Sequence, residues 1–271
     1  MELAFNNLVR DVIAAGKYAA AQQNKISRSI KKDGSILTKT DIELDKLISN
    51  KIKEYFPDAV IISEENPLPS QDTANSKWIF TLDPIDGTDS YSQGMPGWCL
   101  AVGILNSSFE PVGAVVYAPR WGSEAEGGNL LTLIPGGSIK LNGKDLELSS
   151  MDLDEQSIKR NQIMIGSSLH KYFDFSLFNN KLRVSGSAII NIIGTLLHSD
   201  VKGSLITPCY IWDVAPAHAL IRRLGLDLEY YSAGKIDYKA LSDRTKAPDH
   251  FVSGNGETRE LIRGHFKLIE N

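Results

Sequence analysis

The chain has 271 residues, of which 42% are hydrophobic and 23% are charged, and its formal net charge is −4 at pH 7. This composition is enough for a sizeable core, and the lack of a Lys/Arg block argues against nucleic acid or an anionic membrane as the main partner. No apolar stretch approaches the roughly 20 residues of a membrane helix, and no signal-peptide pattern is visible. We therefore expect a cytoplasmic protein that does not bind a membrane, with Cys99 and Cys209 as buried free thiols.

Two amphipathic helices are predicted near the N-terminus. Apolar residues recur near the helical period in residues 3–23, which predicts the first helix. Residues 31–35 form a turn, and a second helix follows, with Thr40 or Asp41 as its cap. It ends before Pro57. Capping alone would account for Asp41.

The stretch Leu82-Asp83-Pro84-Ile85-Asp86-Gly87-Thr88-Asp89 follows an apolar run, Trp78 to Leu82, that is typical of a buried strand. Pro84 disfavours helical geometry at Asp83, and Gly87 permits a tight turn before a helix at Thr88. Carboxylates are ligands for Mg²⁺, and amides at a helix N-terminus bind phosphate. The stretch favours a turn that holds a metal and a phosphate ester together, although an Asp-rich turn without a ligand explains the same residues.

Two other acidic motifs also follow strand-like runs. Ser63-Glu64-Glu65-Asn66 comes after Ala59 to Ile62, and Trp212-Asp213-Val214-Ala215 opens an apolar segment far downstream. Each motif places a carboxylate at the end of a predicted strand or at the start of a helix. All three motifs are therefore candidates for one metal site.

The remaining elements are predicted from apolar runs, turn residues and helical periodicity. Strand-like runs cover residues 99–105, 111–117, 162–165 and 201–207, and residues 252–256 end the last strand. Helical segments cover residues 189–197, 214–224 and 257–263. Glycine-containing turns within 118–149 predict further hairpins of an antiparallel sheet, and the polar residues 150–160 link the two halves of the chain.

In their order along the chain, the three acidic motifs resemble those of the inositol monophosphatase superfamily. That superfamily includes 3'(2'),5'-bisphosphate nucleotidases and some fructose-1,6-bisphosphatases, and the resemblance runs from the first helix to the C-terminus. It implies a Mg²⁺-dependent, lithium-sensitive phosphomonoesterase that forms a homodimer. It also implies an α+β fold, a layered α/β/α/β/α sandwich. The whole chain, residues 1–271, would then form a single phosphatase fold. Its first half, residues 1–149, would contain an antiparallel sheet, and its second half, residues 150–271, a mixed sheet.

The resemblance also implies a role for each acidic residue. Glu64, Asp83 and the carbonyl of Ile85 would bind a first Mg²⁺, while Asp83, Asp86 and Asp213 would bind a second. A third, looser ion would lie near Glu64. Asp83 would bridge the first two ions, so it is the central ligand.

Further residues are implied to act on the substrate. Asp41 and Thr88 would activate water, and the amides of Gly87 and Thr88 would hold the phosphate. A loop lysine would lie near the phosphate, and we assign it to Lys32, with Lys31 as the alternative. The leaving group would contact a Gly-Ser-Ala turn at Ser187 and Ala188.

The substrate is less well defined by these motifs. Ile206 stands where inositol monophosphatases often have a Glu that touches a sugar hydroxyl, and Asp89-Ser90-Tyr91 replaces the Lys-Glu-Phe frequent in nucleotidases. Ala118-Pro119 replaces the usual Asp-Pro. We expect a small phosphorylated polyol or sugar such as inositol monophosphate. The alternatives are a bisphosphate nucleotidase, a fructose-1,6-bisphosphatase or a non-catalytic regulator that binds metal and phosphate.

Overall fold

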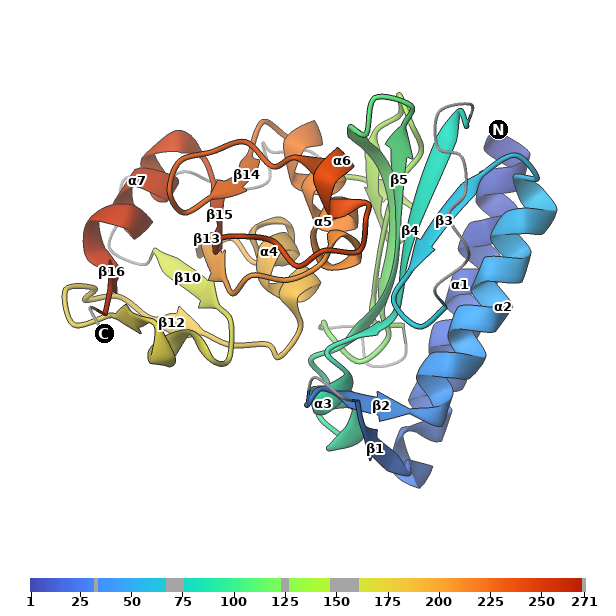
Figure 1. Cartoon of the computed structure of the whole chain (residues 1–271), viewed down its shortest axis with the longest axis horizontal. Coiled ribbons are helices and arrows are strands. Elements are labelled where there is room, and N and C mark those ends of the chain that lie inside the picture. Colours follow the sequence, from blue (N-terminus) through green and yellow to red (C-terminus); the bar gives the residue numbers. More distant parts are fainter. Residues whose placement is uncertain (32–33, 67–75, 123–126, 147–160, 270–271) are drawn as a thin grey trace.

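The computed structural model describes residues 1–31, 34–66, 76–122, 127–146 and 161–269. Two long helices, α1 (Glu2–Gln22) and α2 (Lys39–Tyr55), lie side by side at one end of the molecule (Figure 1). Between them the chain forms a 3₁₀ turn and a short antiparallel hairpin: η1 (Gln23–Lys25), β1 (Arg28–Ile30) and β2 (Ile36–Thr38).

The cap of α2 corrects the sequence prediction. Thr38, rather than Thr40 or Asp41, is the cap: its hydroxyl accepts from the amide of Asp41, and the Asp41 carboxylate accepts from the Thr38 amide at 3.0 Å. This reciprocal pair is a capping box, which satisfies two amides that would otherwise lack helical partners. Asp41 is therefore held in place by the helix start.

A seven-stranded sheet packs against these two helices. Its first strand is parallel to the second, and every other neighbouring pair is antiparallel, so the expected antiparallel sheet is confirmed apart from that edge. In order across the sheet the strands are β3 (Val60–Ser63), β4 (Trp78–Asp86), β5 (Cys99–Asn106), β6 (Pro111–Ala118), β7 (Asn129–Leu133), β8 (Ile139–Leu141) and β9 (Lys144–Asp145). Helix α3 (Thr88–Ser92) directly follows β4.

The second half of the chain contains a mixed five-stranded sheet, as expected. Its order is β12 (Leu182–Arg183), β10 (Gln162–Ile165), β13 (Val201–Ile206), β15 (Phe251–Gly254) and β14 (Asp227–Tyr230). The first three strands are parallel, and the last two are antiparallel to their neighbours. The smaller elements are η5 (Leu169–Lys171), β11 (Phe173–Asp174), α6 (Tyr238–Leu241) and β16 (Lys267–Leu268).

Three hydrophobic clusters hold the layers together. One joins α1 and α2 to the outer face of the large sheet. A second fills the space between the two sheets, where α4 (Ala188–Leu197) and α5 (Ile211–Arg223) lie. A third packs α7 (Gly256–His265) on the far side of the smaller sheet. The layered α/β/α/β/α sandwich is thereby confirmed (Figure 1). Among the described residues, no helix is long and apolar enough to cross a membrane.

Candidate active site

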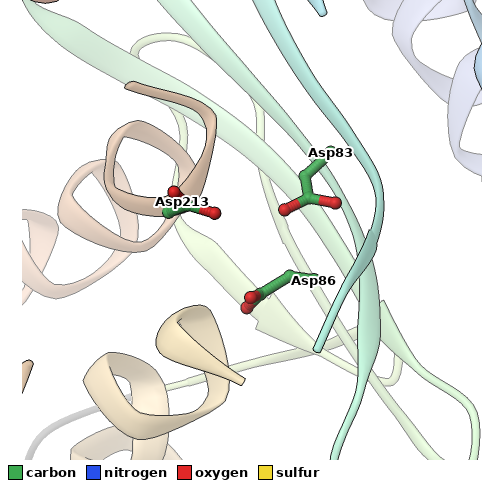
Figure 2. A group of neighbouring side chains, drawn as sticks. All are labelled: Asp83, Asp86 and Asp213. Atoms are coloured by element: carbon green, nitrogen blue, oxygen red, sulfur yellow. The ribbon is translucent and has the colours of Figure 1, made fainter. Parts of the chain in front are cut away.

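Three aspartates meet where α5 faces the large sheet. One carboxylate oxygen each from Asp83, Asp86 and Asp213 lies within 4.8 Å of the other two (Figure 2). Asp83 and Asp86 come from the end of β4, and Asp213 comes from the first turn of α5. The structure thus brings together two motifs that are more than a hundred residues apart in the sequence.

A bulge in β4 places Asp83 and Asp86 together. Side chains three positions apart in a regular strand point to opposite faces. Here Asp83 pairs with Ala101 and Asp86 pairs with Cys99, so β4 has one more residue than β5 over this span. The extra residue turns both carboxylates toward α5, and Pro84 lies inside the bulge, a position that tolerates proline within a sheet. The sequence prediction ended the strand at Leu82 and therefore missed the bulge.

Asp86 is also bound by the start of α4. Its carboxylate accepts hydrogen bonds from the Ser187 hydroxyl, from the Ile189 amide at 2.7 Å and from the Ala188 amide at 3.2 Å. Ser187 in turn accepts from the Ile190 amide at 2.9 Å as the cap of α4. Ser187 and Ala188, which the resemblance implied for substrate contact, therefore touch a proposed metal ligand.

Glu64 lies just beyond the end of β3, and Lys31 pairs with it. Lys31 Nζ is 2.8 Å from Glu64 Oε1 and 2.5 Å from Glu65 Oε1. Burial would lower the pKa of Lys31, and the two carboxylates outweigh that effect and raise it. Lys32, our assigned loop lysine, lies outside the described residues. The alternative, Lys31, has an ammonium group within hydrogen-bond distance of Glu64.

Asp41 and Thr88 come from different elements and are hydrogen-bonded. Thr88 Oγ1 lies 3.1 Å from Asp41 Oδ1 and 2.9 Å from the Ile85 carbonyl oxygen. Burial raises the pKa of Asp41 to about 6, against the hydrogen bonds from Thr38 that favour its charged form. A carboxylate with a pKa near neutrality is suited to proton transfer.

Gly87 makes the turn between Asp86 and Thr88. Its φ is +91°, and a Cβ at this position would lie 2.7 Å from the carbonyl oxygen of Gly97. Both the conformation and the space exclude other residues. Because Gly87 has no side chain, none from this residue covers the backbone amides at the start of α3.

The electrostatics of the cluster fit a divalent cation. Burial, followed by the neighbouring carboxylates of Glu64, Asp86 and Asp213, raises the pKa of Asp83 well above its usual value. Burial and the carboxylates of Asp86 and Glu64 likewise raise the pKa of Asp213 to about 8. Such crowded carboxylates repel one another unless protons or cations neutralise them. Their oxygen donors are the ligands that Mg²⁺ prefers.

Comparisons with known proteins show the family to which the chain belongs. A model of the inositol monophosphatase family matches residues 4–262. Inositol monophosphatase 1 of Solanum lycopersicum is 27% identical over 200 residues, 70% of each chain. The 3'(2'),5'-bisphosphate nucleotidase CysQ of Aggregatibacter actinomycetemcomitans is 26% identical over 250 residues, which cover 85% of this chain and 88% of the relative.

The solved structures show the same fold. The Thermotoga maritima IMPase structure aligns with a TM-score of 0.73 at 18% identity, covering 94% of this chain and 95% of that one. The family model covers nearly the whole chain. This chain therefore belongs to the inositol monophosphatase family of phosphatases.

Proposed function

We propose that this phosphatase uses Mg²⁺ to hydrolyse the phosphate ester of a small polyol or sugar, such as inositol monophosphate. The observation that carries the proposal is the cluster of Asp83, Asp86 and Asp213, together with the hydrogen-bonded pair of Asp41 and Thr88. The cluster supplies cation ligands, and the pair supplies a group that accepts a proton. Metal-assisted hydrolysis of a phosphate ester uses both.

Each carboxylate has a proposed place in the metal site. Glu64, Asp83 and the Ile85 carbonyl would hold a first Mg²⁺, and Asp83, Asp86 and Asp213 would hold a second, with a third ion held loosely near Glu64. When bound, Mg²⁺ lowers the pKa of its water and stabilises negative charge on the phosphate and the leaving oxygen. The structure supports Asp83 as the shared ligand, since one of its carboxylate oxygens lies within 4.8 Å of oxygens of Asp86 and Asp213. Burial and then the carboxylate of Glu64 also raise the pKa of Asp83.

The remaining residues would position water and phosphate. The Thr88 hydroxyl would accept a hydrogen bond from the attacking water and donate one to Asp41, 3.1 Å away. As the water loses a proton to Thr88, Thr88 would pass its own proton to Asp41, the general base. The first amides of a helix have no acceptor within that helix, so those of Gly87 and Thr88 are proposed to hold the phosphate.

A second candidate is 3'(2'),5'-bisphosphate nucleotidase activity. Ile206 stands where inositol monophosphatases often have a Glu that touches a sugar hydroxyl, and its buried aliphatic side chain can make no hydrogen bond to a polyol. The 3'(2'),5'-bisphosphate nucleotidase CysQ is also among the relatives that align over most of the chain, at 85% coverage. Both activities would use the same metal site.

A substrate panel tests the proposal. Phosphate release is measured with Mg²⁺ from inositol monophosphates, sugar phosphates, fructose-1,6-bisphosphate and 3'-phosphoadenosine 5'-phosphate. We expect the highest kcat/KM for a monophosphorylated polyol or sugar. A higher value for the nucleotide would support the second candidate, and no Mg²⁺-dependent release from any of the four classes would contradict both.

A further inference from the structure

Arg244 connects two of the acidic motifs without belonging to either. It lies in the loop between α6 and β15, and its guanidinium group donates through Nη1 to the Ser63 carbonyl and through Nη2 to the Glu64 carbonyl at 2.9 Å. Ser63 is the last residue of β3 and Glu64 directly follows it, so both carbonyls belong to the backbone that positions the Glu64 side chain. One side chain thereby fixes both carbonyls.

The same guanidinium group lies on the aromatic ring that precedes Asp213. Its central carbon is 5.0 Å from the centre of the Trp212 ring, a distance at which a cation is attracted to the ring face. Trp212 also stacks on Tyr210, with ring centres 4.9 Å apart and an angle of 12° between the planes. Tyr210 is tied to the same carboxylate, since its amide donates to Asp213 Oδ2 at 2.7 Å.

The backbone of Arg244 adopts a conformation that is unfavourable for arginine. Its φ is +59°, in the left-handed region that favours glycine. Non-glycine residues persist in this region where the surrounding structure requires them, and such positions cluster at functional sites. A glycine would fit this backbone without strain, so the backbone conformation gives no reason for an arginine here, whereas the contacts of its side chain do.

From these contacts we propose that Arg244 is a positioning residue for the metal site, which sets the position of Glu64 relative to Asp213. The inference rests on the proposed function of the acidic cluster and deepens it. Glu64 and Asp213 are delivered by separate elements, β3 and α5, whereas Asp83 and Asp86 are fixed to each other by β4. Arg244 bridges the two elements on which the geometry of the site depends.

The shape of the guanidinium group is essential to this role. A planar fork donates to two acceptors at once while its face rests on an aromatic ring. A lysine ammonium keeps the charge but lacks the fork and the flat face. Arg244 also places positive charge near Asp45, Glu64 and Glu65, which offsets part of the repulsion among them. The lysine variant therefore separates the effect of geometry from that of charge.

Three variants test the proposal: Arg244→Gly, Arg244→Lys and Arg223→Ala. The glycine variant removes the side chain at a backbone position that glycine favours, so it adds no backbone strain. Arg223 is the matched control because its Nε also donates to a carbonyl across the two halves, that of Gly137 at 2.8 Å, away from the acidic motifs. Metal binding is measured by Mn²⁺ electron paramagnetic resonance and by calorimetric titration with Mg²⁺, and folding is measured as Tm in the presence of a chelator.

We expect Arg244→Gly to raise the Kd for Mn²⁺ by about 10–100-fold, the usual cost of losing a residue that orients a metal ligand. The Mg²⁺ concentration that gives half-maximal phosphate release should rise by a similar factor, because the metal ligands remain but are no longer held in position. Arg244→Lys should resemble the glycine variant, and Arg223→Ala should bind Mn²⁺ as the wild type does.

Unchanged Mn²⁺ affinity in Arg244→Gly would overturn the inference, as would an equal loss in Arg223→Ala. Full affinity in Arg244→Lys would show that only the charge matters and would overturn the positioning role. In each of these cases the wild type still hydrolyses phosphate esters with Mg²⁺, so the proposed function stands. A wild-type protein that binds neither Mn²⁺ nor Mg²⁺ would overturn both.

Discussion

Thr88 stands between Asp41 and Ile85, with its hydroxyl oxygen 3.1 Å from the Asp41 carboxylate and 2.9 Å from the Ile85 carbonyl oxygen. A hydroxyl group has one proton, so it donates fully to only one of these acceptors at a time. If the Ile85 carbonyl is a metal ligand, as proposed, the proton is left to Asp41. Donation to Asp41 would then orient the Thr88 hydroxyl so that its oxygen accepts a hydrogen bond from the attacking water.

We predict that Asp41 and Thr88 act as one unit. Thr88→Ala and Asp41→Asn should each lower the single-turnover rate at saturating Mg²⁺ by about 10²–10⁴-fold, the range for general acid–base groups. Because residues that serve one step are non-additive, the double variant should be little slower than the slower single variant. Fully multiplicative losses would mean that the two residues act independently. Mg²⁺ affinity of Thr88→Ala should be unchanged.

The raised pKa of Asp213 predicts how pH affects the metal-free protein. Its pKa is about 8 in the folded state, against an ordinary 3.8. The protonated carboxyl therefore contributes stability below about pH 4 that is lost as pH rises toward about 8. Without metal, Tm should fall between about pH 5 and about pH 8, and Mg²⁺ should restore it at the higher pH by binding the ionised site.

Asp213→Asn tests this assignment, because asparagine stays neutral throughout. The metal-free variant should lose less Tm over the same pH range than the wild type and should gain less from Mg²⁺. Asp58→Asn, at an exposed turn after α2, is the matched control and should behave as the wild type. Equal pH profiles for the Asp213→Asn variant and the wild type would show that Asp213 does not carry the effect.

Ser187 is predicted to serve both the fold and the site. Its hydroxyl caps α4 and donates to Asp86, so Ser187→Ala should cost about 1 kcal/mol of stability, the usual value of a cap, and should also weaken Mg²⁺ binding. Asn255→Ala is the matched control, since Asn255 caps α7 by accepting from the Thr258 amide at 2.8 Å. It should lose similar stability with no change in Mg²⁺ affinity. Equal Mg²⁺ affinities in the two variants would contradict the second role.

Lithium should inhibit the enzyme. We expect Li⁺ to occupy the second metal site, formed by Asp83, Asp86 and Asp213, as the family resemblance implies. The check is a Li⁺ titration of phosphate release at saturating Mg²⁺. A rate that does not change over the titration would remove this prediction.

Much of the fold followed from local patterns in the sequence. The long helices and the central strands were predicted because apolar periodicity reports burial directly. The ends were less predictable: α5 begins at Ile211, although the apolar run suggested Val214, and α2 is capped by Thr38. Several polar residues in a row are all suitable caps, and the backbone geometry decides among them.

The contacts between motifs were not visible in the sequence. The bulge that turns Asp83 and Asp86 to one side depends on the register between β4 and β5, which no local pattern specifies. Ser187 binding to Asp86, and Arg244 binding to the end of β3, join residues about 100 and 180 positions apart. The family resemblance supplied the candidate ligands, whereas the structure supplied the residues that hold them.

The most direct test of the account is Asp83→Asn. Asp83 is proposed to serve both Mg²⁺ ions, and one of its carboxylate oxygens lies within 4.8 Å of oxygens of Asp86 and Asp213. Phosphate release from inositol monophosphate, or from the best substrate of the panel, is measured for the wild type and the variant at saturating Mg²⁺. We predict a loss of more than about 10²-fold, since even partners of metal ligands cost about 10–100-fold. Near-normal activity of the variant would contradict the metal site and the mechanism built on it.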